Sequence, residues 1–410
     1  MNMTIIKSEL YKIITKKYLW IFLLILSLDF SFITLQMKEY TSVKYSFEPF
    51  KNELQQAMGS PELYKVVKDN EYNATYSEIK QYLPSSVIEY IEKYRTVMND
   101  ERMGEQGTVA VYLENNLASK VCNYFERKDD RINEISNTEK KIIDLIANGE
   151  ENGFEYLVQT KILESFKKAN FIQLNLGRWN QFININIGWL IPSSTILLIL
   201  LGLAGIYSDE YVNKTQSSLL TAKKGRQGIF VSKLVAGVLY SFFCVILFQI
   251  VCLVVTGYVY GLPYNDISLV SLFGFKLTPY TWSAMEFYCI QLGGSLLTAF
   301  VMASMTMFFS VSFKSALLPF FLSGSYYGAT FLLAKMINFS GNVTTLFSLP
   351  AELSPFLLQS MGDFGAKGRF ANLFGLAVPT LYLNIVFHIF IAVLALVFCY
   401  RGYVRKQVKN

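Results

Sequence analysis

The chain has 410 residues, of which 52% are hydrophobic and only 17% are charged, with a formal net charge of +6. Soluble domains contain about 25% charged residues. Several apolar runs here reach the roughly 20 residues that a helix needs to cross a bilayer. These features exclude an ordinary soluble enzyme and predict a polytopic membrane protein.

Residue types that carry catalysis or bind metals are scarce. The single histidine, His388, excludes any catalytic scheme that requires two histidines. The five cysteines form no CxxC pair and no cluster with histidine, so no metal site is predicted. A P-loop needs a Gly-Lys-Ser/Thr sequence, and none occurs. We therefore expect no catalytic residues, metal or cofactor in this chain.

Six apolar segments predict an all-α fold with six transmembrane helices. In chain order they are roughly Tyr18–Met37, Asn186–Tyr207, Leu234–Val255, Phe287–Val311, Ala316–Ile337 and Leu376–Tyr400. Residues 1–37 comprise the amino terminus and the first span. That span's apolar run is longer than that of a signal peptide and lacks a small-residue cleavage pattern, so we expect an uncleaved anchor.

Residues 38–185 predict a mostly helical extracellular domain between spans 1 and 2. The region contains 23 acidic and 19 basic residues, and few proline or glycine residues interrupt it. Apolar residues recur at helical spacing within Ser86–Tyr94 and within Asn137–Ile146. Residues 186–410 then form a five-helix transmembrane domain.

Lysine and arginine residues are distributed unevenly among the segments that flank the spans. With the amino terminus inside, the inner segments hold 14 and the short outer segments hold 4. Cytoplasmic segments normally carry the excess, so both termini are predicted to be cytoplasmic. The inner set is Lys7, Lys12, Lys16, Lys17, Lys214, Lys223, Lys224, Arg226, Lys233, Lys314, Arg401, Arg405, Lys406 and Lys409; the outer set is Lys276, Lys335, Lys367 and Arg369. Because basic patches are confined to membrane flanks, no nucleic-acid binding is expected.

Residues 208–228, between spans 2 and 3, are amphipathic when drawn as a helix. Ser208 suits an N-cap, and the acidic residues Asp209 and Glu210 suit a first turn. The side within an arc of about 100° holds Tyr211, Val212, Thr215 and Leu219, and the other side holds Glu210, Asn213, Lys214 and Ser217. This pattern predicts a short helix along the inner membrane face, either as a plain interfacial anchor or as a functional element.

The same segment resembles the signature of the ABC type-2 transporter permeases. That family has a glutamate after span 2, a Gly-Thr pair, a Leu-Leu pair, a small-or-proline turn, an arginine, and a lysine that opens span 3. The counterparts in this chain are Glu210, Lys214-Thr215, Leu219-Leu220, Ala222-Lys223, Arg226 and Lys233. Lysine replaces the family's glycine, and the proline is absent. The resemblance extends loosely over all six spans.

The resemblance implies the permease subunit of an exporter in a bacterial cell membrane. ATP, with magnesium, would be hydrolysed on separate cytosolic ATPase subunits, and a second permease, identical or related, would pair with this one around the pathway. Glu210 and Arg226 would be polar contacts or hinges where the helix seats on the ATPase, and Tyr211 and Leu219 would anchor it. Thr215, Leu220 and Lys233 complete the matched coupling site. The substrate stays open among peptides, antibiotics, lipid-like molecules and ions.

Three polar residues lie within predicted spans. Asp29 is about 18 Å along the first helix from Lys17, near or beyond the bilayer midplane. Asn384 and His388 are four residues apart in span 6 and share a face. Such residues either line a translocation pathway or hydrogen-bond to neighbouring helices, and Asp29 alternatively reaches the outer interface.

Two other functions are compatible with this sequence. A secondary transporter or channel would need several ionisable residues within its spans, whereas Asp29 and His388 are the chief ones found. A membrane sensor or scaffold would bind a ligand at its extracellular domain and would not need the helix before span 3. A neighbouring ATPase would distinguish the exporter from both.

Overall fold

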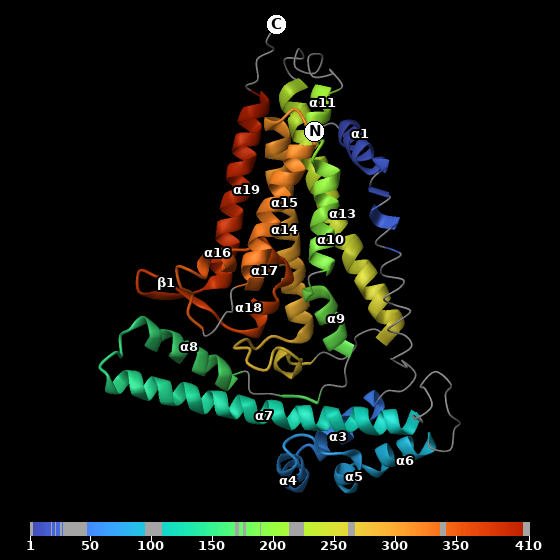
Figure 1. Cartoon of the computed structure of the whole chain (residues 1–410), viewed down its shortest axis with the longest axis vertical. Coiled ribbons are helices and arrows are strands. Elements are labelled where there is room, and N and C mark those ends of the chain that lie inside the picture. The colour runs from blue at the N-terminus through green and yellow to red at the C-terminus, as the bar shows by residue number, and fades with distance from the viewer. Residues whose placement is uncertain are drawn as a thin grey trace.

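The computed structural model describes residues 3–17, 19–20, 22–24, 27, 47–94, 109–168, 172–174, 178–188, 190–212, 225–260, 267–336 and 342–404. These residues form a bundle of long helices with a layer of helices across one of its ends (Figure 1). The amino-terminal helix and the described carboxyl end lie at the opposite end of the bundle (Figure 1).

Five helical segments of the bundle are long and apolar enough to cross a membrane, which identifies a membrane-embedded protein. Their cores are α10 (Leu190–Leu203), α13 (Gly225–Tyr260), α14 (Ala284–Ser312), α15 (Leu317–Met336) and α19 (Thr380–Val404). Helix α14 is central, because it packs against the other four. A capping box formed by Ser283 and Glu286 begins it.

These five segments coincide with predicted spans 2–6, with shifted boundaries. The sixth span begins at Thr380 instead of Leu376, because the residues just before Thr380 pair as a strand. Span 3 belongs to a longer helix than predicted, since α13 already begins at Gly225. The predicted first span, Tyr18–Met37, lies mostly outside the described residues, so this span stays a prediction.

A chain of short helices enters the bundle between α15 and α19. It comprises α16 (Leu349–Glu352), α17 (Pro355–Ser360) and α18 (Gly362–Ala366), and every residue of α17 is buried. Side chains of α14 satisfy part of its backbone: Thr298 donates to the Pro355 carbonyl over 3.2 Å, and Ser295 donates to the Gln359 carbonyl over 3.1 Å. Irregular backbone at membrane depth requires such partners, because no water is available to replace them.

A two-stranded antiparallel hairpin is the exception to the helical fold among the described residues. Strand β1 (Phe370–Leu373) pairs with β2 (Leu376–Pro379), so that Leu373 faces Leu376. The turn residues Phe374 and Gly375 have φ angles of 53° and 87°. Positive φ at both positions is what a type I′ two-residue hairpin turn requires. The prediction of an all-α fold therefore needs this one addition.

The layer across the bundle end is built on α7 (Val109–Ala147), whose 39 residues span about 58 Å. One half of α7 packs on a set of short helices, and the other half packs on α8 (Phe154–Lys168). The short helices are η1 (Glu48–Phe50), α3 (Lys51–Ala57), α4 (Pro61–Asp69), α5 (Tyr76–Ile79), η2 (Lys80–Tyr82) and α6 (Ser85–Lys93). The predicted helices at 86–94 and 137–146 coincide with α6 and the end of α7.

Polar contacts of α7 hold this layer on the bundle. Arg131 is fully buried and donates to the Thr278 carbonyl over 2.7 Å and to the Phe166 carbonyl over 3.2 Å. Burial lowers the pKa of its guanidinium to about 10, so it stays charged at neutral pH. Asp130 pairs with Lys276 at 2.6 Å. Thr278 and Lys276 belong to the connection that follows η4 (Leu269–Ser271), so α7 rests on the segment that leads into α14.

Candidate functional site

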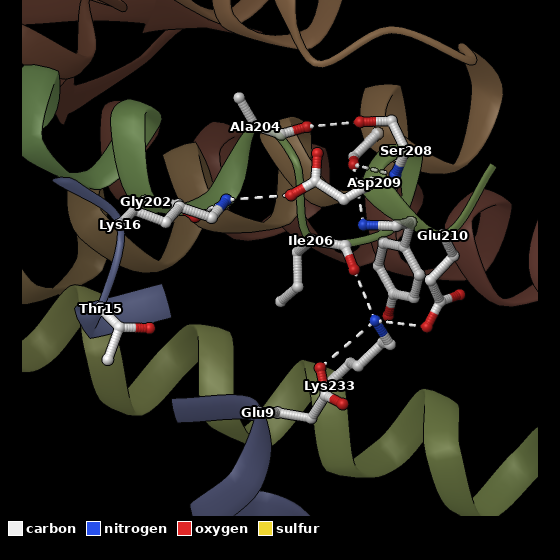
Figure 2. Close-up of polar contacts among 12 residues, drawn as sticks. Glu9, Thr15, Lys16, Gly202, Ala204, Ile206, Ser208, Asp209, Glu210 and Lys233 are labelled. Carbon is white, nitrogen blue, oxygen red and sulfur yellow. Dashed lines mark hydrogen bonds and ion pairs between the residues drawn. The ribbon is translucent and has the colours of Figure 1, made fainter. Parts of the chain in front are cut away.

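A buried lysine joins three segments at the end of the bundle opposite the helical layer. Lys233 lies in the third turn of α13, and 3% of its side chain is exposed. Its ammonium group donates to the Ile206 carbonyl over 2.5 Å and contacts the carboxylates of Glu210 at 2.7 Å and Glu9 at 3.3 Å (Figure 2). Three acceptors surround this ammonium group, as its three donors require.

Glu210 reaches Lys233 because the start of its helix is anchored on α14. Helix α11 (Ser208–Val212) follows a turn in which the amides of Tyr207 and Ser208 donate to the Ser310 hydroxyl over 3.1 and 3.2 Å. We expected Ser208 to cap this helix. Instead its hydroxyl donates back to the Ala204 carbonyl over 3.2 Å (Figure 2).

Glu9 comes from the amino-terminal helix α1 (Met3–Ile14), and the sequence reasoning missed it. Burial by itself raises the pKa of this carboxyl, but the Lys233 ammonium and a 2.6 Å bond from Lys12 hold the pKa below its ordinary value. Ile6, Glu9 and Ile13 are the buried residues of α1. A carboxylate on an otherwise apolar helix face was the available signal.

A second ion pair links the amino-terminal segment to α11. The Lys16 ammonium lies 3.3 Å from the Asp209 carboxylate and also donates to the Gly202 carbonyl over 3.2 Å (Figure 2). Gly205 makes room for this arrangement, because a Cβ atom there would lie 2.3 Å from Asp209 Oδ2. The amino-terminal segment is thus tied to α11 directly through Lys16 and indirectly through Lys233.

Most of residues 208–228, the predicted amphipathic helix, lies between α11 and α13. Of residues 208–228, the structure describes 208–212 and the start of α13 at Gly225. Thr215, Leu219 and Leu220 lie outside the described residues, as do the side chains of Tyr211 and Arg226. The structure therefore brings Glu210 and Lys233 together, and the other five predicted contacts stay predictions.

Asn384 and His388 are buried polar residues of α19, in the half of the helix nearer the helical layer. The Asn384 amide donates to the Glu352 and Ser354 carbonyls over 2.6 and 3.2 Å. Nδ1 of His388 is 2.9 Å from the Asn384 carbonyl oxygen, and its Nε2 is 3.4 Å from the Tyr326 hydroxyl. Both residues are fully buried. The contacts of Asn384 support the short-helix segment, whereas those of His388 are made within α19 and with α15. Asp29, predicted to join them, lies outside the described residues.

A buried ion pair beside Asn384 was also missed by sequence reasoning. Arg369 and Glu352 lie 2.7 Å apart, and their side chains are 4% and 0% exposed. The Thr344 hydroxyl donates to the same glutamate over 2.5 Å. These residues fall in the connection between spans 5 and 6, which has no periodicity that would have signalled burial. Among the described residues, no group of three histidine, cysteine, aspartate or glutamate side chains could hold a metal ion.

The fold and these sites define a mostly helical, membrane-embedded protein with a buried charge cluster at one end of its bundle. Comparisons with protein-family models, curated proteins and solved structures gave no match.

Proposed function

We propose that this chain is the permease subunit of an ATP-driven exporter, and that the Lys233 cluster transmits the movement of a partner ATPase into the bundle. The observation that carries the proposal is the position of Lys233. Its ammonium group connects α1, α11 and α13, and the last two are the helices that flank residues 213–224. A force on that segment would be delivered to both of its ends.

The burial of the cluster supports a mechanical role. Removing one member of a buried ion pair typically costs about 3–5 kcal/mol, because it leaves an uncompensated buried charge. Lys233, Glu210 and Glu9 would therefore tend to move together instead of separating. Helix α13 packs on α14, and α11 is hydrogen-bonded to α14 through Ser310. Displacement of the cluster would therefore reach the centre of the bundle.

The proposal includes partners that this chain does not contain. ATP and magnesium would bind to cytosolic ATPase subunits beneath residues 213–224, and a second permease would complete the pathway. The excess of basic residues at this end favours the cytoplasmic side. The helical layer would then be extracellular, where it would meet the exported substrate.

A membrane sensor is the second candidate, and the docking of the layer favours it. Arg131 and the Asp130–Lys276 pair attach α7 to the segment that leads into α14. Ligand binding on the layer would thus reach the central helix without any ATPase. The two functions differ in whether the opposite end of the bundle engages a nucleotide-hydrolysing partner.

The test is to purify the full-length chain from its native membranes with a photo-crosslinker at position 216. An exporter permease should co-purify with magnesium-dependent ATP hydrolysis, and position 216 should crosslink to the hydrolysing subunit. The same crosslinker at Glu150, an exposed position beyond α7, is the matched control and should not reach that subunit. ATP hydrolysis no higher than in a mock purification, without a crosslink from 216, would reject the exporter and favour the sensor.

A charge-neutral variant then tests the role of the cluster itself. Lys233→Met, Glu9→Gln and Glu210→Gln together leave no unpaired buried charge, so insertion and assembly should persist. Substrate-stimulated ATP turnover should fall towards the basal rate, because the ionic link between α1, α11 and α13 is gone. Full stimulation in this variant would show that the cluster only stabilises the fold.

A further inference from the structure

Two neighbouring loops expose the three most solvent-accessible large apolar side chains of the described residues. Phe374 is 103% exposed, Leu346 is 90% exposed and Phe347 is 82% exposed. Leu373 and Leu376, which flank the hairpin turn, are exposed as well. None of the residues at 345–347 or 372–376 is charged. So much uncovered apolar surface in one place marks an interaction site.

Backbone pairing joins the two loops into one unit. The Thr344 amide donates to the Phe370 carbonyl over 2.8 Å, and the Phe370 amide donates to the Asn342 carbonyl over 2.9 Å. Residues 342–344 therefore run beside β1, and the 345–347 loop leaves from the edge of the hairpin. We refer to Leu346, Phe347, Leu373, Phe374 and Leu376 together as the apolar tip.

One face of the hairpin is already occupied by the helical layer. Ala377 shares a small core with Val158, Ile162 and Phe166 of α8, and Lys161 donates to the Ala377 carbonyl over 2.8 Å. Successive side chains of a strand point to opposite faces, so Leu376 and its partner Leu373 project away from the face that Ala377 presents to α8. In Figure 1 the hairpin lies above α8, near the lower end of α19. At the turn end of the hairpin, the face that carries Leu373 and Leu376 is exposed.

The length of α19 places the hairpin at a membrane boundary. Arg401, near the carboxyl end of this helix, is exposed. A hydrocarbon core of about 30 Å corresponds to about 20 helical residues, which puts the other boundary near Leu381. The hairpin ends at Pro379, immediately before this point. Exposed apolar residues such as Val386 and Phe390 continue from there along α19, so the apolar tip extends a lipid-facing surface.

The turn itself adds an argument for a role of Phe374. A bulky residue is uncommon at positive φ, and a turn of this type favours asparagine or aspartate followed by glycine. Phe374 nevertheless adopts a φ of 53° and makes the most exposed apolar side chain of the described chain. Backbone strain at an exposed apolar residue indicates that the side chain is kept for a contact outside this chain.

We propose that the apolar tip inserts into the boundary between lipid headgroups and acyl chains, and that it holds α8, and through α8 the helical layer, at a fixed height above the bilayer. The occupant is lipid. The hairpin is the connecting part, since one of its faces contacts α8 and its other face meets the membrane. This inference does not depend on the proposed exporter function.

The test uses a spin label at Phe374→Cys in the full-length chain, reconstituted in phosphatidylcholine and phosphatidylglycerol vesicles. The exposed native cysteine is removed by Cys289→Ser. Collisions with oxygen, which concentrates in lipid, should exceed collisions with a water-soluble nickel chelate. Val386→Cys on the exposed surface of α19 should behave alike, and Glu150→Cys should show the reverse order. Preferential nickel access at position 374, or strong spin–spin broadening from a second copy, would overturn the lipid assignment.

A second measurement tests the support of the layer. Phe374→Asp with Leu376→Asp should increase amide hydrogen exchange in α8 of the vesicle-bound protein, because charged side chains are expelled from the boundary. Asn52→Asp, at an exposed polar position of α3 away from the hairpin, is the control and should leave α8 unchanged. Unchanged α8 protection in an inserted double variant would show that the tip does not support the layer.

Discussion

Lys233 links α1 and α11 to α13, and its position in the sequence indicated only part of this role. It was expected to open a transmembrane helix, but it lies in the third turn of α13 and is almost completely buried. A buried ammonium group is tolerated when carboxylates and carbonyls replace its hydration. Glu9, Glu210 and the Ile206 carbonyl do this, and all three come from outside α13.

The pKa of Glu9 predicts how acid affects this cluster. A carboxyl whose pKa is lowered by folding stabilises the protein fully above its unfolded pKa, about 4.3, and loses that contribution as the pH falls through the lowered value. Glu9→Gln leaves Lys233 paired with Glu210, so no buried charge loses its only partner. The substitution should therefore destabilise the protein at pH 7 by about 1.5–3 kcal/mol, a typical value for a hydrogen bond to a charged group. Thermal unfolding of both proteins in detergent should show the difference shrinking below about pH 4.

The control for this experiment is Glu150→Gln, an exposed position where no change in unfolding temperature is expected. A Glu9→Gln difference that stays constant down to pH 3 would mean that Glu9 acts through packing and not through its charge.

At the scale of elements, the close approach of α14 and α17 depends on one glycine. A Cβ atom on Gly294 would lie 2.2 Å from the Leu358 carbonyl oxygen, a backbone atom that cannot rotate away. The adjacent Gly293 has nothing within 4 Å of the corresponding position. The two neighbouring glycines thus differ in the space around them, and packing requires only Gly294 to lack a side chain.

This difference predicts opposite effects of the same substitution. Gly294→Ala should destabilise the bundle by about 1–3 kcal/mol, the usual cost of overpacking. Gly293→Ala should be neutral or stabilise α14 by up to about 1 kcal/mol, because alanine is the better helix former. Unfolding of the two variants in the same detergent provides the measurement. Equal effects at both positions would contradict the described packing of α17 on α14.

At the scale of the whole molecule, the helical layer and the Lys233 cluster lie at opposite ends of the bundle (Figure 1). Any signal between them must pass along the long helices. Helix α14 is suited to carry it, since the segment before it contacts Arg131 and its last turn holds Ser310, which anchors α11. The two ends should also face opposite sides of the membrane.

The uneven distribution of basic residues predicts which side each end faces. In intact cells without the exposed cysteine (Cys289→Ser), an impermeant thiol reagent should label Glu150→Cys and should not label Lys223→Cys. Permeabilised cells are the control, in which both positions should react. External labelling at position 223 would reverse the orientation and remove the proposed ATPase from reach of the cluster.

Features that depend on local pattern could be predicted from the sequence alone. Apolar runs of about 20 residues predicted spans 2–6 because a bilayer demands that length, and helical spacing located α6 and the end of α7. The pairing of Glu9 and Glu210 with Lys233, and of Glu352 with Arg369, was decided only by tertiary structure. The partners of Lys233 are separated along the chain, and no periodicity connects them. The position of Asn384 illustrates the same limit. Its place in a span predicted that it either lines a pathway or bonds to neighbouring helices, but the short-helix segment that accepts its hydrogen bonds becomes visible only in the folded chain.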